Sequence, residues 1–172
     1  MRNKNNSVQI LFLVVASIVM SLCYASDLDY MAAKHRNALK DWLAENNKYR
    51  LATIDDCECL ENVLSLRRGS GGAWKPQPDY QPYYVANDFN GDGVSDFAVV
   101  VRPMVSEEGS LVLIFLGKSG GGYAVPLVHS VRERSIANLG FFLGRAKEKP
   151  VVLLIGVFFS EGEVISIPTT KK

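Results

Sequence analysis

Residues 151–159, Val-Val-Leu-Leu-Ile-Gly-Val-Phe-Phe, form the longest apolar run that follows the N-terminal segment. The run is apolar at both alternating sets of positions, which indicates a strand covered on both faces rather than one with a side toward solvent. We therefore expect a strand over 151–157 at the centre of a β-sheet.

Shorter apolar or β-branched runs accompany this strand. They occupy residues 97–101, 111–116, 123–128, 139–143 and 164–167. The segments between them are too short to hold a crossover helix, so neighbouring strands are expected to pair antiparallel. The sequence predicts a mostly antiparallel sheet connected as a meander.

Residues 26–46 have a helical periodicity. The side chains at steps of three and four are Leu28, Met31, Ala32, His35, Ala38, Leu39, Trp42 and Leu43. This spacing places them on one face of an amphipathic helix, which needs an apolar surface to cover. We expect the helix to pack on the sheet, in a single α+β domain over residues 26–172. His35 lies on the apolar stripe and is expected to be a core residue rather than a catalyst.

The segment after the helix is less regular. A short strand is expected over 49–54, and 60–66 is interpreted as a second strand or a helical turn. Residues 67–84 are predicted to be a flexible loop because they combine several glycines with three prolines, which fix φ and remove backbone donors.

This loop also carries aromatic side chains. They are Trp74, Tyr80, Tyr83 and Tyr84. The rings suggest either an exposed platform for a carbohydrate or protein ligand, or a set of anchors that pins a long loop to the core. The second interpretation is favoured.

Residues 88–96, Asp-Phe-Asn-Gly-Asp-Gly-Val-Ser-Asp, carry oxygen-bearing side chains at alternating positions. The candidate ligands are the side chains of Asp88, Asn90, Asp92 and Asp96 and the backbone carbonyl of Val94. Calcium takes six to eight oxygen ligands from a chain that curls tightly around it, and a glycine at the sixth position permits the turn. The stretch predicts a Ca²⁺ loop inserted before the strand 97–101.

The match to the helix–loop–helix calcium motif is incomplete. Position 12 is Val99 where that motif places a bidentate glutamate, and the loop runs into a predicted strand. Residues 87–101 instead resemble the calcium loop of FG-GAP/VCBS-type repeats, as found in integrin α-chain propellers. The resemblance implies a calcium ion at the five positions named above. It does not imply the propeller fold, because the chain has one such loop and too few residues for several blades.

The alternative is a metal-free turn, because Asp, Asn and Gly also dominate ordinary turns. Three aspartates within nine residues repel one another unless a cation neutralises them, which favours the calcium site. The ligands leave no evident open position beside an acid or nucleophile. The ion is therefore expected to be structural.

Two cysteines, Cys57 and Cys59, lie in an acidic stretch. In an exported protein they suggest a local disulfide, with reduced structural thiols and redox or metal chemistry as alternatives. A redox role is disfavoured because the neighbouring carboxylates would raise the thiol pKa values. A zinc site would need two further ligands, and His35 and His129 each stand alone in the sequence.

Residues 1–25 have the three-part layout of a secretory signal peptide. Arg2 and Lys4 precede an apolar core, and small residues at Cys23 and Ala25 precede the expected cleavage site. The core over 10–20 is shorter than the roughly 20 residues that span a bilayer. We expect export to the periplasm or the medium, with a retained anchor or lipidation at Cys23 as alternatives.

Cleavage after Ala25 would leave 147 of the 172 residues, with 17 basic and 18 acidic side chains. This balance gives no electrostatic reason to bind nucleic acid or an anionic membrane. No catalytic constellation is visible, because the serines lack a glycine-flanked elbow and the two histidines cannot be arranged into a triad. The function expected is binding or a structural accessory role for an exported, calcium-stabilised domain. A secreted hydrolase or an inhibitor-like protein is the alternative.

Overall fold

The computed structural model describes residues 28–70, 75–106, 108–131, 135–146, 149–158 and 162–168. The predicted signal peptide and Trp74 fall outside these residues. The chain divides into two compact units, residues 1–36 and 37–172. Within the described residues, every helix is too short or too polar to cross a bilayer.

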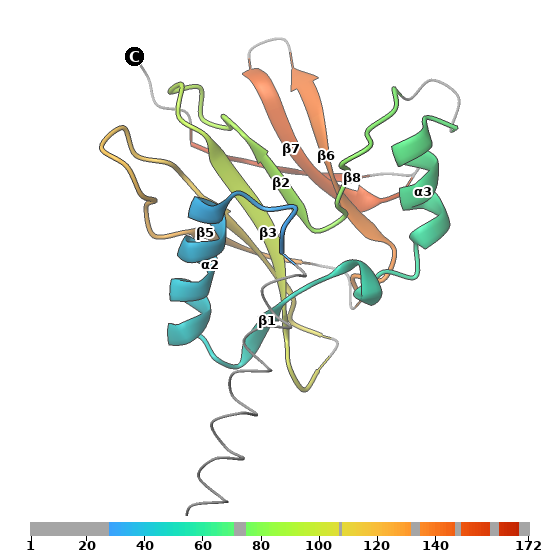
Figure 1. Ribbon diagram of the computed structural model, residues 1–172, viewed down its shortest axis with the longest axis horizontal. Coiled ribbons are helices and arrows are strands. Elements are labelled where there is room, and N and C mark those ends of the chain that lie inside the picture. Colours follow the sequence, from blue (N-terminus) through green and yellow to red (C-terminus); the bar gives the residue numbers. More distant parts are fainter. Residues whose placement is uncertain are drawn as a thin grey trace, which may run out of the picture. The chain divides into compact units, whose positions relative to one another are not determined.

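The helices lie in the N-terminal half of the chain, and all strands except the first follow them (Figure 1). The helices are α2 (Ala33–Glu45), the 3₁₀ turn η1 (Ile54–Asp56) and α3 (Leu60–Arg68). The strands are β1 (Tyr49–Leu51), β2 (Tyr84–Asn87), β3 (Asp96–Pro103), β4 (Leu111–Phe115), β5 (Leu127–Ser130), β6 (Leu139–Ala146), β7 (Lys149–Val157) and β8 (Gly162–Ile165).

Strand β3 is the centre of a five-stranded antiparallel sheet. It pairs with β4 on one side and with both β1 and β2 on the other, and β5 follows β4 at the edge. Between β1 and β2 the ladder continues through Val100, whose carbonyl accepts from Ala52 N at 2.9 Å and whose N–H donates to the Tyr83 carbonyl at 3.1 Å. The predicted strand 97–101 therefore forms, and its side chains are 0% exposed.

Strands β6, β7 and β8 form a second antiparallel sheet with β7 in the middle. The predicted central position of 151–157 is thus confirmed, although in the smaller sheet. The single meander is not observed, because in the described part of the chain β5 and β6 belong to different sheets and do not pair with each other. Phe141 of β6 instead donates its N–H to the Pro82 carbonyl at 2.9 Å, just before β2. The connection after β5 is too long for a tight hairpin, which frees β6 to start a new sheet.

One hydrophobic cluster joins the two sheets and α3, and the α+β class is confirmed. Its members include Ala98, Val100, Val112 and Ile114 from the first sheet, Phe141, Leu153, Ile155 and Ile165 from the second, and Val63 and Leu66 from α3. On the opposite face of β3, Phe97 stacks on Phe115 with ring centroids 4.4 Å apart, and Tyr123 meets Phe97 edge-on at 5.0 Å. Aromatic pairs at these separations add to the stability that burial supplies.

Helix α2 starts at Ala33, later than the predicted helix 26–46. Residues 28–30 form a turn instead, in which Met31 N donates to the Leu28 carbonyl at 2.9 Å. Arg36 secures this turn by donating to the Leu28 carbonyl at 3.1 Å and to Asp29 at 2.9 Å. The arginine thus holds the carbonyl that a longer helix would have used in its own ladder.

The structure also defines the segments 49–54 and 60–66, for which the sequence allowed only approximate or alternative predictions. The expected strand 49–54 is shorter, because β1 ends at Leu51 and η1 begins at Ile54. Residues 60–66 belong to α3, which ends at Gly69 with φ 73°, a left-handed cap that glycine adopts without strain. A helix satisfies the backbone groups of this segment internally, so it needs no sheet edge.

The predicted loop 67–84 is pinned to the core by two of its tyrosines. Tyr80 and Tyr83 are 9% and 2% exposed, and Tyr83 donates its hydroxyl to the Ile136 carbonyl at 2.6 Å. The Tyr80 hydroxyl lies where a Cβ on Gly140 would be, so the ring sits against β6. The favoured interpretation is confirmed for these two residues. Tyr84 is half-buried in β2.

Candidate functional site

The predicted calcium loop curls around the side chain of Asp88. Its Oδ1 accepts from the backbone N–H groups of Gly91 at 2.8 Å and Asp92 at 3.1 Å, and its Oδ2 accepts from Gly93 N at 2.8 Å. Gly91 and Gly93 have φ of 78° and 86°, which other residues adopt only with strain. The two glycines are therefore required by the turn that Asp88 organises.

Two further predicted ligands contact each other inside this turn. Asn90 Oδ1 accepts from Asp92 N at 3.0 Å, and Asn90 Nδ2 donates to Asp92 Oδ2 at 3.0 Å. Asp92 Oδ1 accepts from Val94 N at 2.7 Å. The loop thus brings the side chains of Asn90 and Asp92 together and directs Asp88 at the backbone between them.

Asp96, expected to close the site, has a different environment. It is 0% exposed, and its two oxygens accept from Phe89 N and Gly117 N, each at 2.8 Å. Burial, followed by repulsion from Asp92, raises the pKa of Asp96 against the lowering effect of these hydrogen bonds. Asp96 therefore joins the loop to the turn after β4, a role that the sequence pattern did not reveal.

The residues of the loop fit a calcium ion in chemistry. Asp88 Oδ1 already accepts two backbone N–H groups, whereas Asp88 Oδ2 and the oxygens of Asp92 and Asp96 each accept one hydrogen bond and keep a lone pair for a cation. Asn90 is 7% exposed and would offer its amide oxygen. Within the described residues, no three His, Cys, Asp or Glu side chains are grouped to hold a metal ion, so the structure does not bring Asp88, Asp92 and Asp96 together as a ligand set.

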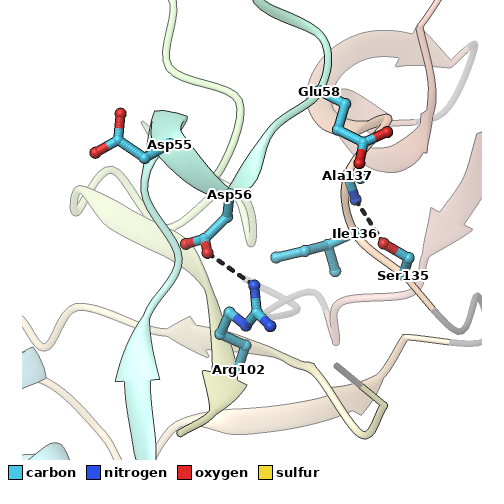
Figure 2. A pocket seen from close by; sticks show the side chains of 7 residues that line it. All are labelled: Asp55, Asp56, Glu58, Arg102, Ser135, Ile136 and Ala137. Atoms are coloured by element: carbon cyan, nitrogen blue, oxygen red, sulfur yellow. Dashed lines mark hydrogen bonds and ion pairs between the residues drawn. The ribbon is translucent and has the colours of Figure 1, made fainter. Parts of the chain in front are cut away.

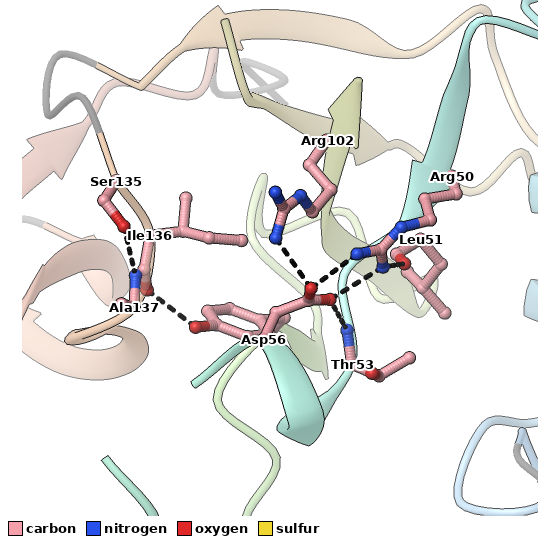
Figure 3. Close-up of polar contacts among 9 residues, drawn as sticks. Arg50, Leu51, Thr53, Asp56, Arg102, Ser135, Ile136 and Ala137 are labelled. Atoms are coloured by element: carbon pink, nitrogen blue, oxygen red, sulfur yellow. Dashed lines mark hydrogen bonds and ion pairs between the residues drawn. The ribbon is translucent and has the colours of Figure 1, made fainter. Parts of the chain in front are cut away.

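A second polar centre lies at the C-terminal end of β3. Asp56 of η1 accepts from Arg50 Nη2 at 2.6 Å and Nη1 at 2.8 Å, and from Arg102 Nη1 at 2.8 Å. Thr53 N adds a fourth bond at 2.8 Å. Figure 3 shows the two guanidinium groups directed at Asp56 from β1 and β3.

The charge state of Asp56 follows from these bonds. Its side chain is 7% exposed, and burial, the largest single influence, would raise its pKa. The hydrogen bonds from Arg50, Thr53 and Arg102, with the charge of Arg50, outweigh burial and hold the pKa of Asp56 below its usual range. Asp56 is therefore ionised across the physiological range.

A polar cavity of about 200 Å³ opens beside this centre (Figure 2). It is lined by Asp55, Asp56, Glu58, Arg102, Ser135, Ile136 and Ala137. Two segments distant in sequence meet here, η1 with the cysteine stretch on one side and residues 135–137 on the other. Ile136 is tied to the core by the Tyr83 hydroxyl, which fixes one wall of the cavity.

Cys57 and Cys59 are joined by a disulfide. The two residues are 8% and 2% exposed and belong to the hydrophobic cluster. Their ring contains Glu58, which is exposed at the cavity. Because thiol–disulfide exchange requires access for an attacking thiolate, burial of both sulfur-bearing residues disfavours a redox role.

The two histidines lie in different settings. His35 is 2% exposed, and burial, followed by the charge of Lys34, lowers the pKa of His35 to about 4. It is neutral at physiological pH, as expected for a core residue. His129 of β5 lies 3.7 Å from Glu163 of β8 through its Nε2 atom.

Sequence reasoning missed several residues of the Asp56 centre and of the adjoining cavity. Arg102 is a charged residue at the end of an apolar strand, and such an interruption is a signal that could have marked it. Arg50 and Ser135 gave no comparable signal, because isolated arginines and serines are ordinary on surfaces. Their grouping depends on the pairing of β1 with β3, which places Arg50 opposite Arg102.

Comparison with known proteins assigns no family to this chain. No family model matches the chain, and neither the curated proteins nor the solved structures include a significant match.

Proposed function

We propose that the protein is an exported small domain with a binding or structural accessory role, stabilised by a calcium ion in the loop 88–96. The observation that carries the proposal is the conformation of Asp88, whose carboxylate accepts three backbone N–H groups of its own loop. A chain that curls tightly is what a calcium loop needs if its oxygen atoms are to converge on the ion.

Each predicted ligand has a defined part in this proposal. Asp88 and Asp92 supply carboxylate oxygens and Asn90 an amide oxygen, with Val94 offering its carbonyl. Asp96 would ligate through lone pairs beyond those that hold Phe89 N and Gly117 N. Bound calcium would neutralise the repulsion among the carboxylates. The loop leads directly into β3, so its order bears on the central strand.

The proposed role is binding rather than catalysis. An enzyme requires a nucleophile, acid or base placed beside an open ligand position, and the loop is packed with its own backbone donors. The partner we expect is a protein or a carbohydrate. Of the four loop aromatics, Tyr80 and Tyr83 contribute to the core, so contact with a partner would fall to Tyr84 or Trp74.

Export is proposed on the signal-peptide pattern of residues 1–25 alone. The mature chain should begin at Ser26 and be recovered from the periplasm or the medium. Intact-mass measurement of the exported protein tests this. A mass that includes residues 1–25 would overturn it.

Thermal unfolding with calcium and with a chelator tests the metal site. Calcium that binds the folded loop and not the unfolded chain should stabilise the parent protein by about 2.7 kcal/mol at a hundredfold excess over its dissociation constant. Asp92→Ala removes a carboxylate that bonds Asn90 and Val94 and should abolish this gain.

The matched control is Asp79→Ala, which removes an exposed carboxylate from another turn. This variant should keep the full calcium gain. An equal melting temperature of the parent protein in both conditions would show that the loop is an ordinary turn.

A further inference from the structure

The cavity beside Asp56 is smaller than a typical site for a drug-sized molecule. Its volume of about 200 Å³ is below the range of roughly 300–1,000 Å³ typical of drug-sized ligands. A guest with a few heavy atoms, comparable to a small amino acid, would fill it. Ile136 is the apolar residue of the wall, and the remaining lining is mainly charged or polar.

Arg102 gives the cavity a cationic side. Arg102 is the cationic residue of a lining that also holds the carboxylates of Asp55, Asp56 and Glu58. Asp56 is shared between Arg102 and Arg50, which lies outside the lining, so these three side chains carry a formal charge of +1. Among the described residues the Arg102 guanidinium donates only to Asp56, through Nη1. Its Nε is buried and without a hydrogen-bond partner, so a ligand would use the remaining Nη donors. A guanidinium with unused donors beside a cavity is suited to a carboxylate, which it can bind through two hydrogen bonds.

Glu58 gives the opposite side an anionic group. Its side chain lines the cavity and makes no hydrogen bond within the described part of the chain. Figure 2 shows Glu58 across the cavity from Arg102, next to Ala137, whereas the Asp55 carboxylate points away from Arg102. The lining therefore offers the Glu58 carboxylate apart from the ion pair of Arg102 and Asp56.

The disulfide explains how an exposed glutamate keeps this position. Cys57 and Cys59 are anchored in the hydrophobic cluster, and the bond between them closes a ring in which Glu58 is the middle residue. Closing so small a ring restricts the backbone on both sides of Glu58. Such pre-organisation lowers the entropy lost when a ligand binds.

We propose that this cavity binds a small zwitterion of the α-amino acid class, with its carboxylate on Arg102 and its ammonium group on Glu58, and that the Cys57–Cys59 disulfide holds Glu58 in place. The ligand carboxylate takes the unused Nη donors of the guanidinium, and its ammonium group takes the Glu58 carboxylate of the same lining. The inference does not depend on the calcium loop, which precedes β3, whereas Arg102 lies near the C-terminal end of that strand.

The test uses glycine as the probe, with acetate and methylammonium as its two halves. Binding is followed by chemical-shift changes of the Ile136 and Ala137 amides in the full-length mature protein. Each charge-assisted hydrogen bond changes affinity by roughly 10- to 100-fold, so glycine should bind at least about tenfold more tightly than either half. Equal affinity for glycine and acetate would overturn the proposal.

Variants separate the two ends of the site. Glu58→Gln should weaken the binding of glycine by about tenfold and leave the affinity for acetate unchanged. Arg102→Lys, which keeps the charge beside Asp56, should weaken the binding of both ligands. The matched control is Glu61→Gln, an exposed carboxylate in the first turn of α3 outside the cavity. Unchanged glycine affinity in Glu58→Gln would exclude the assigned ammonium site.

The role of the disulfide has its own comparison. Replacing both cysteines by serine should lower the affinity of the parent protein for glycine. The same replacement should not lower that affinity further in the Glu58→Gln variant. An equal effect in both backgrounds would show that the ring does not act through Glu58. Repeating the titrations with a chelator separates this proposal from the calcium proposal, because glycine binding should not change.

Discussion

Asp56 and Asp96 are both buried carboxylates, and they differ in what surrounds them. Asp56 accepts from two arginines and one backbone N–H, whereas Asp96 accepts from the backbone at Phe89 and Gly117. Burial is the largest influence on both and raises the pKa of each, but the arginine contacts reverse the outcome at Asp56. The pKa of Asp56 is therefore lowered, whereas that of Asp96 is raised.

The difference indicates what each carboxylate contributes. Asp56 compensates the charge of two cations on neighbouring strands, so removing its charge should leave those cations uncompensated. Asp96 fixes the position of two backbone segments, so its region should be sensitive to backbone displacement. One centre depends on charge and the other on close packing.

Asp56→Asn should have the largest effect. Removing one partner of a buried ion pair costs about 3–5 kcal/mol, and the lower end is expected because the Arg50 side chain is 33% exposed. Urea unfolding at neutral pH measures the loss. Asp55→Asn, an exposed neighbour, should change stability by less than about 0.5 kcal/mol. Equal losses of stability in the two variants would contradict the interpretation that Asp56 compensates the charges of Arg50 and Arg102.

Gly117→Ala tests the packing side of the comparison. A Cβ at Gly117 would lie 2.6 Å from Val94 Cγ1 and 2.7 Å from the Ser95 carbonyl oxygen, so the loop and the turn would have to separate. The expected loss is about 2 kcal/mol by urea unfolding. At Gly120, three residues on, a Cβ would meet nothing within 4 Å. Gly120→Ala should therefore be nearly neutral, and a matching loss there would mean that the turn tolerates no alanine for another reason.

The double variant Cys57→Ser/Cys59→Ser should have a smaller effect. The bond spans a sequence separation of 2, and so short a loop constrains few unfolded conformations. We expect a loss of about 1–2 kcal/mol, measured by urea unfolding. Reducing the parent protein with a thiol should reproduce it. A loss above about 4 kcal/mol would show that the bond holds more than its own ring.

The acid dependence should show the smallest effect. The folded pKa of Asp56 is lowered, so its contribution is complete above the unfolded value of about 3.9 and decreases as the pH falls through the folded pKa. The stability difference between the parent protein and Asp56→Asn should narrow by only about 0.3 kcal/mol between pH 7 and pH 4. It should narrow more steeply below pH 4. A difference that grows on acidification would contradict the lowered pKa.

Much of the fold was predictable because it depends on local patterns. The runs at 97–101 and 151–157 are apolar at every position or nearly so, and both are central strands in the structure. The division into two sheets was not predictable, because it depends on whether β6 pairs with β5 or starts a new sheet with β7. That choice follows from the contact of Phe141 with Pro82, a tertiary contact with no periodic signal.

The candidate sites divide in the same way. The loop 88–96 was recognisable because its residues are contiguous and their chemistry is periodic. The cavity was not, since Arg102, Glu58 and Ser135 come from separate segments. The burial of Asp96 was also hidden, because its partner Gly117 is 21 residues away and joins it only after β3 and β4 pair.

The continuous pairing of β3 has a consequence for hydrogen exchange. Its backbone is bonded on one side to β4 and on the other to β1, Ala52, Tyr83 and β2. Detaching either neighbour would expose the fully buried side chains of 97–101 to water, which makes opening on one side alone costly. Amides of β3 should therefore exchange with deuterium only when the whole domain unfolds. Their exchange rates would report the global free energy of unfolding in water, without denaturant.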